Sequence, residues 1–225
     1  KYIKDYLATI RSVDDNIGRV LEYLKVNGLE ENTIVIYASD QGFFLGEHGF
    51  FDKRFMYEEA LHMPFIIRYP GKIKPRTVVN DIITNIDFAP TLLEMAGVSV
   101  PEAVQGKSFF NNLKGKTSKD WRQSMYYHYY EYPFYHRVQP HYGIRNQRYK
   151  LIHFYYDVDI WEFYDLQNDS SEINNLINSE THTEIIDSLK TELYRLKEEY
   201  GNTMSLSELR NISDTDFGGL ESNKK

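Results

Sequence analysis

The sequence predicts an α/β fold, with a mostly parallel sheet and flanking helices followed by a small antiparallel sheet that one helix covers. First, a long helical periodicity leads into a short, nearly continuous apolar run, which is the rhythm of α/β domains. Second, residues 124–166 contain four aromatic strand segments joined by turn-like residues. Third, an amphipathic pattern over residues 184–200 predicts a helix to cover that second sheet.

Composition limits the classes of protein that the chain can represent. Of its 225 residues, 41% are hydrophobic and 26% are charged, which fits one large domain or one domain plus a smaller one and argues against wholesale disorder. The net charge of -7 disfavours a general nucleic-acid binder. With no cysteine, the chain holds no disulfide, thiolate metal site or cysteine nucleophile. We see no targeting signal and expect no membrane span, because no apolar run is long enough.

The first elements follow the α/β order. Residues 2–25 carry apolar side chains at steps of three and four, which predicts a helix, and Gly28 is suited to end it. Residues 32–39, "NTIVIYAS", form a β-branched run that fits a strand covered on both faces of a parallel sheet. Asp40 then falls at the carboxyl end of a strand, the edge where open α/β sheets bind ligands.

The next elements continue the pattern up to about residue 115. Residues 57–63 predict a brief helix. Residues 64–69 and 81–86 are expected to form a second and a third strand. Residues 87–97 predict a helix that Asp87 caps.

The composition changes near residues 114–120, where we expect a boundary. Strands are predicted at residues 124–130, 141–146, 148–156 and 162–166, and the covering helix at 184–200. We therefore divide the chain into an α/β part at residues 1–115, a small α+β subdomain at 116–205 and a tail at 206–225.

The segment "SDQG" that follows the first strand carries candidate metal ligands. Asp40 offers a carboxylate and Gln41 an amide oxygen, both suited to Ca²⁺ or Mg²⁺, and Gly42 permits the turn that would aim them at one ion. Two ligands are too few for calcium, which takes about six to eight oxygens. The alternative is that Asp40 is an ordinary turn or cap residue.

Cationic side chains follow the candidate ligands. Lys53 could hold an anionic oxygen, although most lysines are surface charges. Arg54 could equally be a salt-bridge partner. His48 could contact substrate or donate a proton, and its alternative is a structural hydrogen bond within the loop.

The aromatic stretch from residue 126 to residue 145 has two interpretations. The first is core packing and surface hydrogen bonding. The second is a substrate wall in which rings stack on sugar faces, and its candidate contacts are His136, Arg137, His141 and Arg145.

Several motifs, in order, resemble the second half of the formylglycine-type sulfatases, members of the alkaline phosphatase-like superfamily. They are "SVDDNIGR", "NTIVIYASD", "GEHG" with the lysine after it, "MPFIIRYPG", "TNIDFAPTLLEMAGV", "YGIRNQRYKLIHF" and "EFYDLQNDSSEINNL". The segment "DQGFFLGEHGFFDKRFMYEE" is most similar to bacterial sulfatases of glycosaminoglycan sugars, including N-acetylglucosamine-6-sulfatase-like proteins.

The resemblance implies a role for three of the residues above. Asp40 and Gln41 match metal ligands of the family, with Ca²⁺ expected and Mg²⁺ as the alternative, and Lys53 matches the lysine that contacts the sulfate. A cation and a lysine together would neutralise the sulfate oxygens and stabilise charge that develops in the transition state.

The chain also departs from the family pattern. The nucleophile of the family is a formylglycine made within a Cys/Ser-x-Pro-Ser-Arg motif, which this sequence lacks. We therefore expect a missing N-terminal half that carries the formylglycine, and a chain that is catalytically incomplete alone. Its partners would be that half or another copy of itself, together with a sulfated carbohydrate. The resemblance implies a periplasmic or extracytoplasmic location. The alternatives are a non-catalytic glycan-binding module and a phosphate-ester or phosphonate hydrolase of the same superfamily.

Overall fold

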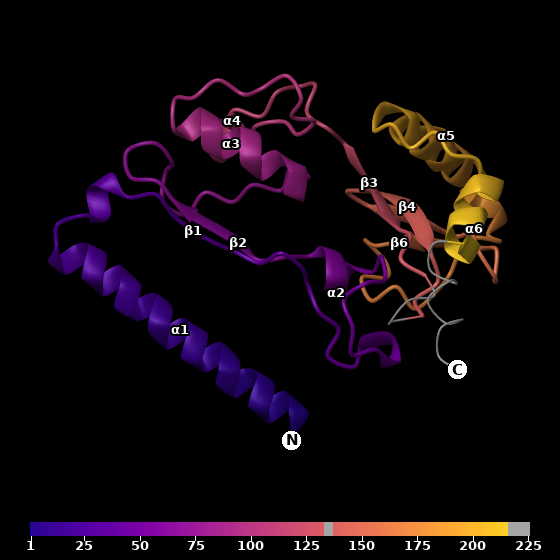
Figure 1. The fold of residues 1–225 in the computed structure, drawn as a ribbon, viewed down its shortest axis with the longest axis horizontal. Helices are drawn as coiled ribbons and strands as arrows, with labels where there is room; N and C mark the ends of the chain where they lie inside the picture. Colours follow the sequence, from indigo (N-terminus) through magenta and orange to yellow (C-terminus); the bar gives the residue numbers. More distant parts are fainter. Residues whose placement is uncertain (133–136, 216–225) are drawn as a thin grey trace.

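The computed structural model describes residues 1–132 and 137–215 and contains two separate sheets (Figure 1). Sheet A pairs β1 (Val35–Ala38) with β2 (Phe65–Arg68). Sheet B has the order β3-β4-β5-β6, with bounds Ser124–Tyr129, His141–Asn146, Tyr149–Phe154 and Ile160–Asp165. The helices are α1 (Tyr2–Val26), α2 (Glu58–Leu61), α3 (Phe88–Met95), α4 (Phe110–Leu113), α5 (Thr183–Glu199) and α6 (Leu206–Thr215).

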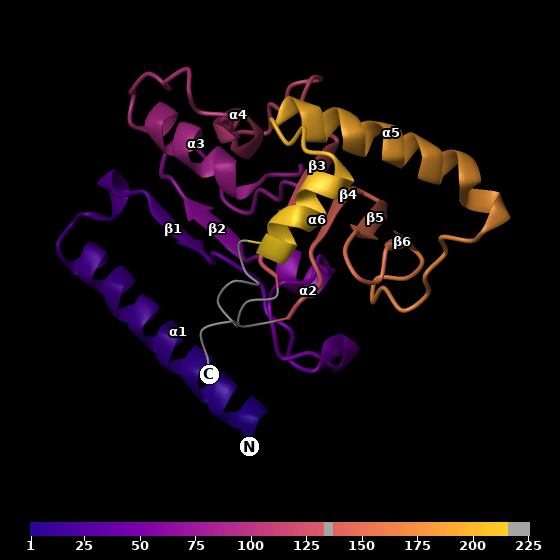
Figure 2. The ribbon, with the colours of Figure 1, turned by 45° about the vertical axis from the view of Figure 1, so that its right-hand side comes forward.

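Helix α1 forms where its periodicity predicts and ends at the predicted glycine. Gly28 has a φ of +67°, a left-handed conformation that favours glycine, and its N–H donates to the carbonyl of Lys25. None of the residues of α1 is buried, and the helix lies apart from sheet A in both ribbon views (Figure 2). The apolar face of α1 is thus largely uncovered within the described residues.

Sheet A is antiparallel, so the predicted parallel sheet is not found within the described residues. Val35 pairs with Arg68 and Ala38 with Phe65. The apolar composition of residues 32–39 predicts a strand covered on both faces, but no residue of β1 or β2 is buried, and Tyr37 and Ile66 are exposed. Composition also carries no information on strand direction, which depends on the path of the connection over residues 39–64. One face of the sheet packs against α3 and α4 around Phe109 and Trp121.

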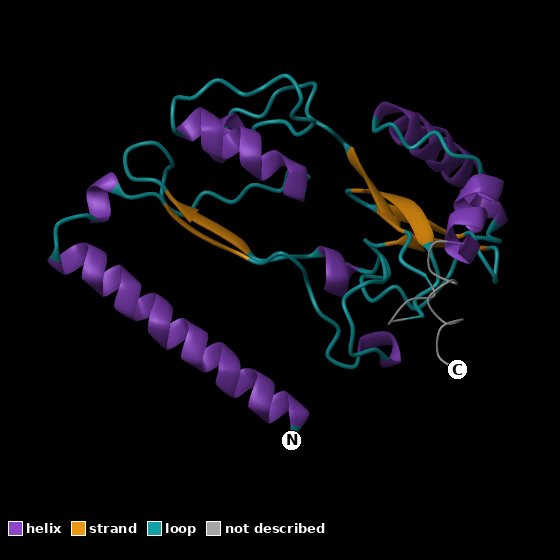
Figure 3. Ribbon diagram, in the orientation of Figure 1, coloured by secondary structure: helices purple, strands orange, loops and turns teal. Residues whose placement is uncertain are grey.

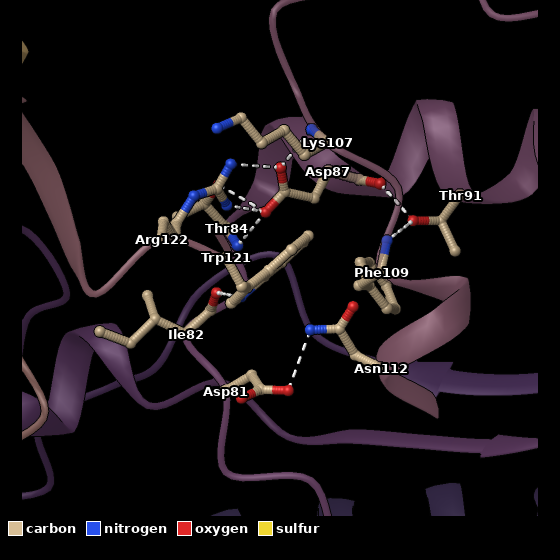
Figure 4. Close-up of polar contacts among 10 residues, drawn as sticks. All are labelled: Asp81, Ile82, Thr84, Asp87, Thr91, Lys107, Phe109, Asn112, Trp121 and Arg122. Atoms are coloured by element: carbon tan, nitrogen blue, oxygen red, sulfur yellow. Dashed lines mark hydrogen bonds and ion pairs between the residues drawn. The ribbon is translucent and has the colours of Figure 1, made fainter. Parts of the chain in front are cut away.

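The predicted third strand at residues 81–86 is also wrong. Side chains, rather than a neighbouring strand, bond to two backbone groups of this segment: Trp121 Nε1 donates to the carbonyl of Ile82 at 2.9 Å, and the N–H of Thr84 donates to Asp87 at 2.8 Å (Figure 4). Residues 85–87 turn into a 3₁₀ helix before α3 begins. Polar side chains have therefore replaced strand pairing here.

Asp87 is fully buried and organises this corner of the fold, rather than capping α3 as predicted. Its carboxylate accepts hydrogen bonds from Thr84, from the backbone of Lys107 and from both terminal nitrogens of Arg122 (Figure 4). Its side chain makes no cap hydrogen bond to α3. Burial of a carboxylate is costly unless hydrogen bonds and ion pairs satisfy it, so these contacts make Asp87 a structural residue.

Sheet B carries most of the core, and both of its faces are covered. The predicted antiparallel meander is confirmed, and His141–Asn146 matches its prediction at both ends. Because side chains alternate across a strand, Tyr142 and Ile144 pack under α5 while Gly143 and Arg145 face the segment with α2. Figure 3 shows the two sheets apart from each other, with sheet A and sheet B at different places in the fold.

Part of the segment assigned to the tail is helical. Residues 206–215 form α6, whose Leu209 is buried in the core beneath α5. The rest of the predicted tail, residues 216–225, lies outside the described residues. Over the part of the chain that the structure describes, no helix has both the length and the apolar character needed to cross a membrane.

Candidate functional site

A cavity of about 850 Å³ lies between the two sheets, and we call it the Asp40 cavity. Asp40 at the end of β1 and Glu58 and His62 around α2 line one side. Arg145 of sheet B lines another, and Phe109 by α4 adds an apolar wall. The predicted ligand edge of β1 therefore opens onto a cavity.

The candidate metal ligands Asp40 and Gln41 present free oxygens. Asp40 is exposed, and its carboxylate makes no hydrogen bond or ion pair with residues 1–132 or 137–215. The Gln41 side chain donates from Nε2 to the carbonyl of Ala60 at 2.7 Å. Because that acceptor is a carbonyl, the nitrogen must face it, which leaves Oε1 of Gln41 available to a ligand.

Gly42 lets this loop dock closely on α2. Its N–H also donates to the carbonyl of Ala60, at 2.9 Å, and a Cβ at position 42 would lie 2.0 Å from the carbonyl oxygen of Glu59. Only glycine permits that approach. The carbonyl of Ala60 thus fixes both Gln41 and Gly42.

Lys53 lies on a loop that folds back toward the candidate ligands. The N–H of Phe44 donates to the carbonyl of Asp52 at 2.8 Å, a register that puts Lys53 opposite Phe43. Lys53 is exposed, and its ammonium makes no ion pair within the described residues. Arg54, by contrast, pairs with Asp52 at 2.7 Å. Lys53 does not line the Asp40 cavity.

The structure gives two of the predicted substrate contacts structural surroundings. His48 is half-buried, stacks on Tyr57 with ring centroids 4.4 Å apart, and lies 3.7 Å from Glu59. His141 is fully buried, and its Nδ1 lies 2.8 Å from the carbonyl of Gln139. Burial lowers the pKa of His141 to about 4, so the ring is neutral at neutral pH.

The remaining predicted contacts fall in different places. His136 lies outside the described residues, and Arg137 is exposed with a φ of +50°. Arg145 reaches the wall of the Asp40 cavity, but two of its nitrogens bind the two oxygens of Glu58, each at 2.9 Å. The guanidinium is therefore already paired with a carboxylate.

Sequence reasoning missed the ion cluster around Glu58. Fully buried Lys150 lies 2.9 Å from Glu58 and 2.7 Å from Glu172, and Glu172 also accepts the backbone N–H of Glu58 at 2.7 Å. Burial opposes ionisation of Glu58, but hydrogen bonds from Arg145 and the charge of Lys150 outweigh it and lower the Glu58 pKa to about 2. Burial raises the pKa of Glu172. The available signal was a lysine inside an apolar strand.

The donor set fits a hard divalent cation in part. A carboxylate and an amide oxygen are the ligand types that Ca²⁺ and Mg²⁺ prefer. Over the described residues, no group of three or more His, Cys, Asp or Glu side chains could hold a metal ion. Asp40 and Gln41 therefore match one part of a coordination shell whose other ligands would have to come from elsewhere.

Comparison with known proteins assigns a family. Residues 46–199 match the family described as N-sulphoglucosamine sulphohydrolase, C-terminal. The chain is 58% identical over 178 residues to the N-acetylglucosamine-6-O-sulfatase of Bacteroides thetaiotaomicron, covering 78% of this chain and 32% of that protein. It is 34% identical to the arylsulfatase of Clostridium perfringens, covering 82% and 38%. The chain thus spans about a third of the length of these relatives.

Solved structures share the same fold. A protein in complex with its substrate D-glucosamine-2-N,6-O-disulfate superposes with a TM-score of 0.87 at 51% identity, over 90% of this chain and 41% of that chain. A phosphonate monoester hydrolase of Silicibacter pomeroyi superposes with a TM-score of 0.74 at 29% identity, over 83% and 38%.

Proposed function

Because this chain belongs to the N-sulphoglucosamine sulphohydrolase C-terminal family of sulfatases, we propose that it is part of a metal-dependent enzyme that hydrolyses sulfate esters of glucosamine units in sulfated glycans. The 58% identity to an N-acetylglucosamine-6-O-sulfatase carries the proposed substrate class. The free oxygens of Asp40 and Gln41 at the end of β1 support the metal dependence.

In this proposal, each residue of the site has one task. Asp40 and Gln41 would hold a divalent cation, with Ca²⁺ expected and Mg²⁺ as the alternative, and when bound the cation would supply charge that draws electrons from the sulfate oxygens. Lys53 places its ammonium against a second sulfate oxygen. Preorganised charge lowers the barrier because it stabilises the oxyanion that develops in the transition state. These groups therefore act mainly on the transition state.

The nucleophile would come from outside this chain. The sequence has no cysteine and no Ser-x-Pro-Ser-Arg motif, so a formylglycine would belong to an N-terminal part of the complete protein. By complete protein we mean this chain joined to that part. The chain alone should then be catalytically incomplete.

The uncovered face of α1 supports such a partner. Along this face the helix exposes large apolar side chains: Tyr2, Ile3, Leu7, Ile10, Val13, Val20 and Leu21. Apolar surface on this scale is typical of an interface. We propose that the N-terminal part covers this face. In a sizing experiment, self-association of the complete protein would contradict this proposal.

Replacement of Lys53 tests the proposed chemistry. In the complete protein, Lys53→Ala should lower kcat/KM for 6-O-sulfated N-acetylglucosamine about a hundred- to a thousandfold, because one preorganised charge at the oxyanion is lost. The matched control is Lys74→Ala, which removes an exposed lysine from the loop after β2 and should leave kcat/KM unchanged. Equal rates for wild type and Lys53→Ala would refute the assignment.

The structural likeness to a phosphonate monoester hydrolase favours one second candidate, a phosphate-ester or phosphonate hydrolase. The same cation and lysine would bind either kind of oxyanion. Turnover of matched aryl sulfate and aryl phosphonate esters by the complete protein separates the two, and we expect the sulfate ester to be preferred. Glycan binding without turnover of either ester would instead indicate a non-catalytic module.

A further inference from the structure

We infer that the buried ion cluster of Glu58, Arg145, Lys150 and Glu172 positions the candidate metal ligand Gln41 by fixing helix α2, so that these four are positioning residues for the metal site. The inference rests on the function proposed above. It assigns to sheet B the role of positioning a metal ligand, although the four residues need not contact the substrate.

The cluster begins with an arrangement that is unfavourable within sheet B alone. Arg145 on β4 and Lys150 on β5 are direct cross-strand partners. Two like charges at such positions repel each other. Glu58 lies between them, with its carboxylate 2.9 Å from Lys150 and bonded twice to Arg145 at 2.9 Å. Sheet B therefore holds the first residue of α2 through charge.

Glu172 completes the charge balance and fixes the backbone of α2. It lies 2.7 Å from Lys150 and accepts the N–H of Glu58 at 2.7 Å. Two cations thus meet two carboxylates, which suits a site where Lys150 and Glu172 are almost fully buried. Glu172 has a φ of +51°, a left-handed conformation that costs a non-glycine residue energy and that the surrounding contacts must enforce.

The short helix passes this constraint to the ligand loop. Two residues after Glu58, the carbonyl of Ala60 accepts Nε2 of Gln41 at 2.7 Å and the N–H of Gly42 at 2.9 Å. The position of Ala60 therefore decides where Oε1 of Gln41 lies. Outer groups that orient a metal ligand commonly alter metal affinity about 10- to 100-fold when they are lost.

Two variants of the complete protein test the inference. Glu58→Gln keeps the shape of the side chain but removes the charge that joins α2 to sheet B. The double variant Lys150→Met with Glu172→Gln removes one charge of each sign, so no unpaired charge stays in the core, and it keeps an acceptor for the N–H of Glu58. Because it is charge-balanced, the double variant decides the matter if Glu58→Gln does not fold.

The matched control is Arg148→Met. Arg148 forms a two-bond ion pair with Asp165 at the same sheet, at 2.9 and 2.7 Å, but neither side chain forms a hydrogen bond or ion pair with α2 within the described residues. This variant should lose thermal stability without any change at the ligand loop.

The decisive readout is the dissociation constant for Ca²⁺, measured by competition with a chelating dye, alongside Tm in EDTA. We expect the Kd to rise roughly tenfold in both cluster variants, to remain unchanged in Arg148→Met, and kcat to recover at saturating Ca²⁺. Unchanged Ca²⁺ affinity in folded cluster variants whose Tm falls as in the control would overturn the inference. Failure of the wild-type protein to bind Ca²⁺ or Mg²⁺ would instead overturn the proposed metal site, and the inference with it.

Discussion

Helices α1 and α5 carry the same kind of apolar periodicity, but only α5 is covered. Helix α5 buries Ile186, Leu189, Leu193 and Leu196 against sheet B, whereas α1, which is longer, buries none of its residues. The difference teaches that periodicity specifies an apolar face and not the partner that covers it. Sheet B supplies that partner for α5 within this chain, and we have proposed an N-terminal part for α1.

The largest expected effect is a loss of the stability of sheet B in acid. Burial, followed by the charges of Lys197 and His141, lowers the pKa of His128 to about 4, and burial lowers that of His141 to about 4. Below the unfolded value of about 6.5, the unfolded chain binds protons that the folded chain excludes. Stability should therefore be fully present above pH 6.5 and fall toward pH 4, by roughly 3 kcal/mol for each histidine.

Urea denaturation near pH 7 and near pH 4, followed by tryptophan fluorescence, measures this loss. Trp161 reports on sheet B because it lies on β6 and stacks on His153 of β5, with ring centroids 4.1 Å apart. His141→Phe keeps an aromatic ring among its neighbours and removes one titrating group, so it should flatten the pH dependence. The same slope in wild type and His141→Phe would contradict the assignment.

The next effect compares one substitution in the two helices. Leu193→Ala in α5 removes a fully buried side chain and should lower the free energy of unfolding by about 3 kcal/mol. Leu7→Ala in α1 removes an exposed side chain and should change it by less than about 0.5 kcal/mol in this chain.

Repeating Leu7→Ala in the complete protein sharpens the comparison. If the N-terminal part covers α1, the cost should rise to about 2 kcal/mol, as for a buried leucine. A cost that stays below about 0.5 kcal/mol there would show that the face of α1 is not covered.

Most elements could be predicted from local patterns. The helix over residues 2–25, the four strands of sheet B and the helix over 184–200 each agree with the structure to within a few residues. Local patterns failed where side chains outside the segment bond to its backbone: residues 81–86 form no strand, and Trp121 and Asp87 each take one of its backbone hydrogen bonds. Strand direction in sheet A likewise depends on a connection and not on composition.

The candidate site shows the same division. The position of Asp40 at a strand end followed from the residues around it, because the apolar run ends there. The ion cluster could not be predicted, because Glu58 meets Arg145 and Glu172 only through the fold. A long-range contact of this kind leaves no local pattern, and the buried Lys150 was its one visible trace.

The smallest expected effect distinguishes the two faces of sheet B. On β3, the hydroxyl of Tyr127 donates to the carbonyl of Arg54 at 2.7 Å, next to Lys53, while the hydroxyl of Tyr126 on the other face accepts from Asn202 at 2.6 Å. Each tyrosine-to-phenylalanine change removes one hydrogen bond and should cost about 1 kcal/mol of stability.

Of the two variants, only Tyr127→Phe should affect the sulfate, because only the Tyr127 hydroxyl bonds to the segment that carries Lys53. In the complete protein we expect its KM for a sulfate ester to rise about fivefold, the factor that corresponds to about 1 kcal/mol, with the Kd for Ca²⁺ unchanged. Tyr126→Phe should leave both constants alone. If the two variants shift KM equally, the effect is a general loosening of sheet B, and the face toward α2 has no special relation to Lys53.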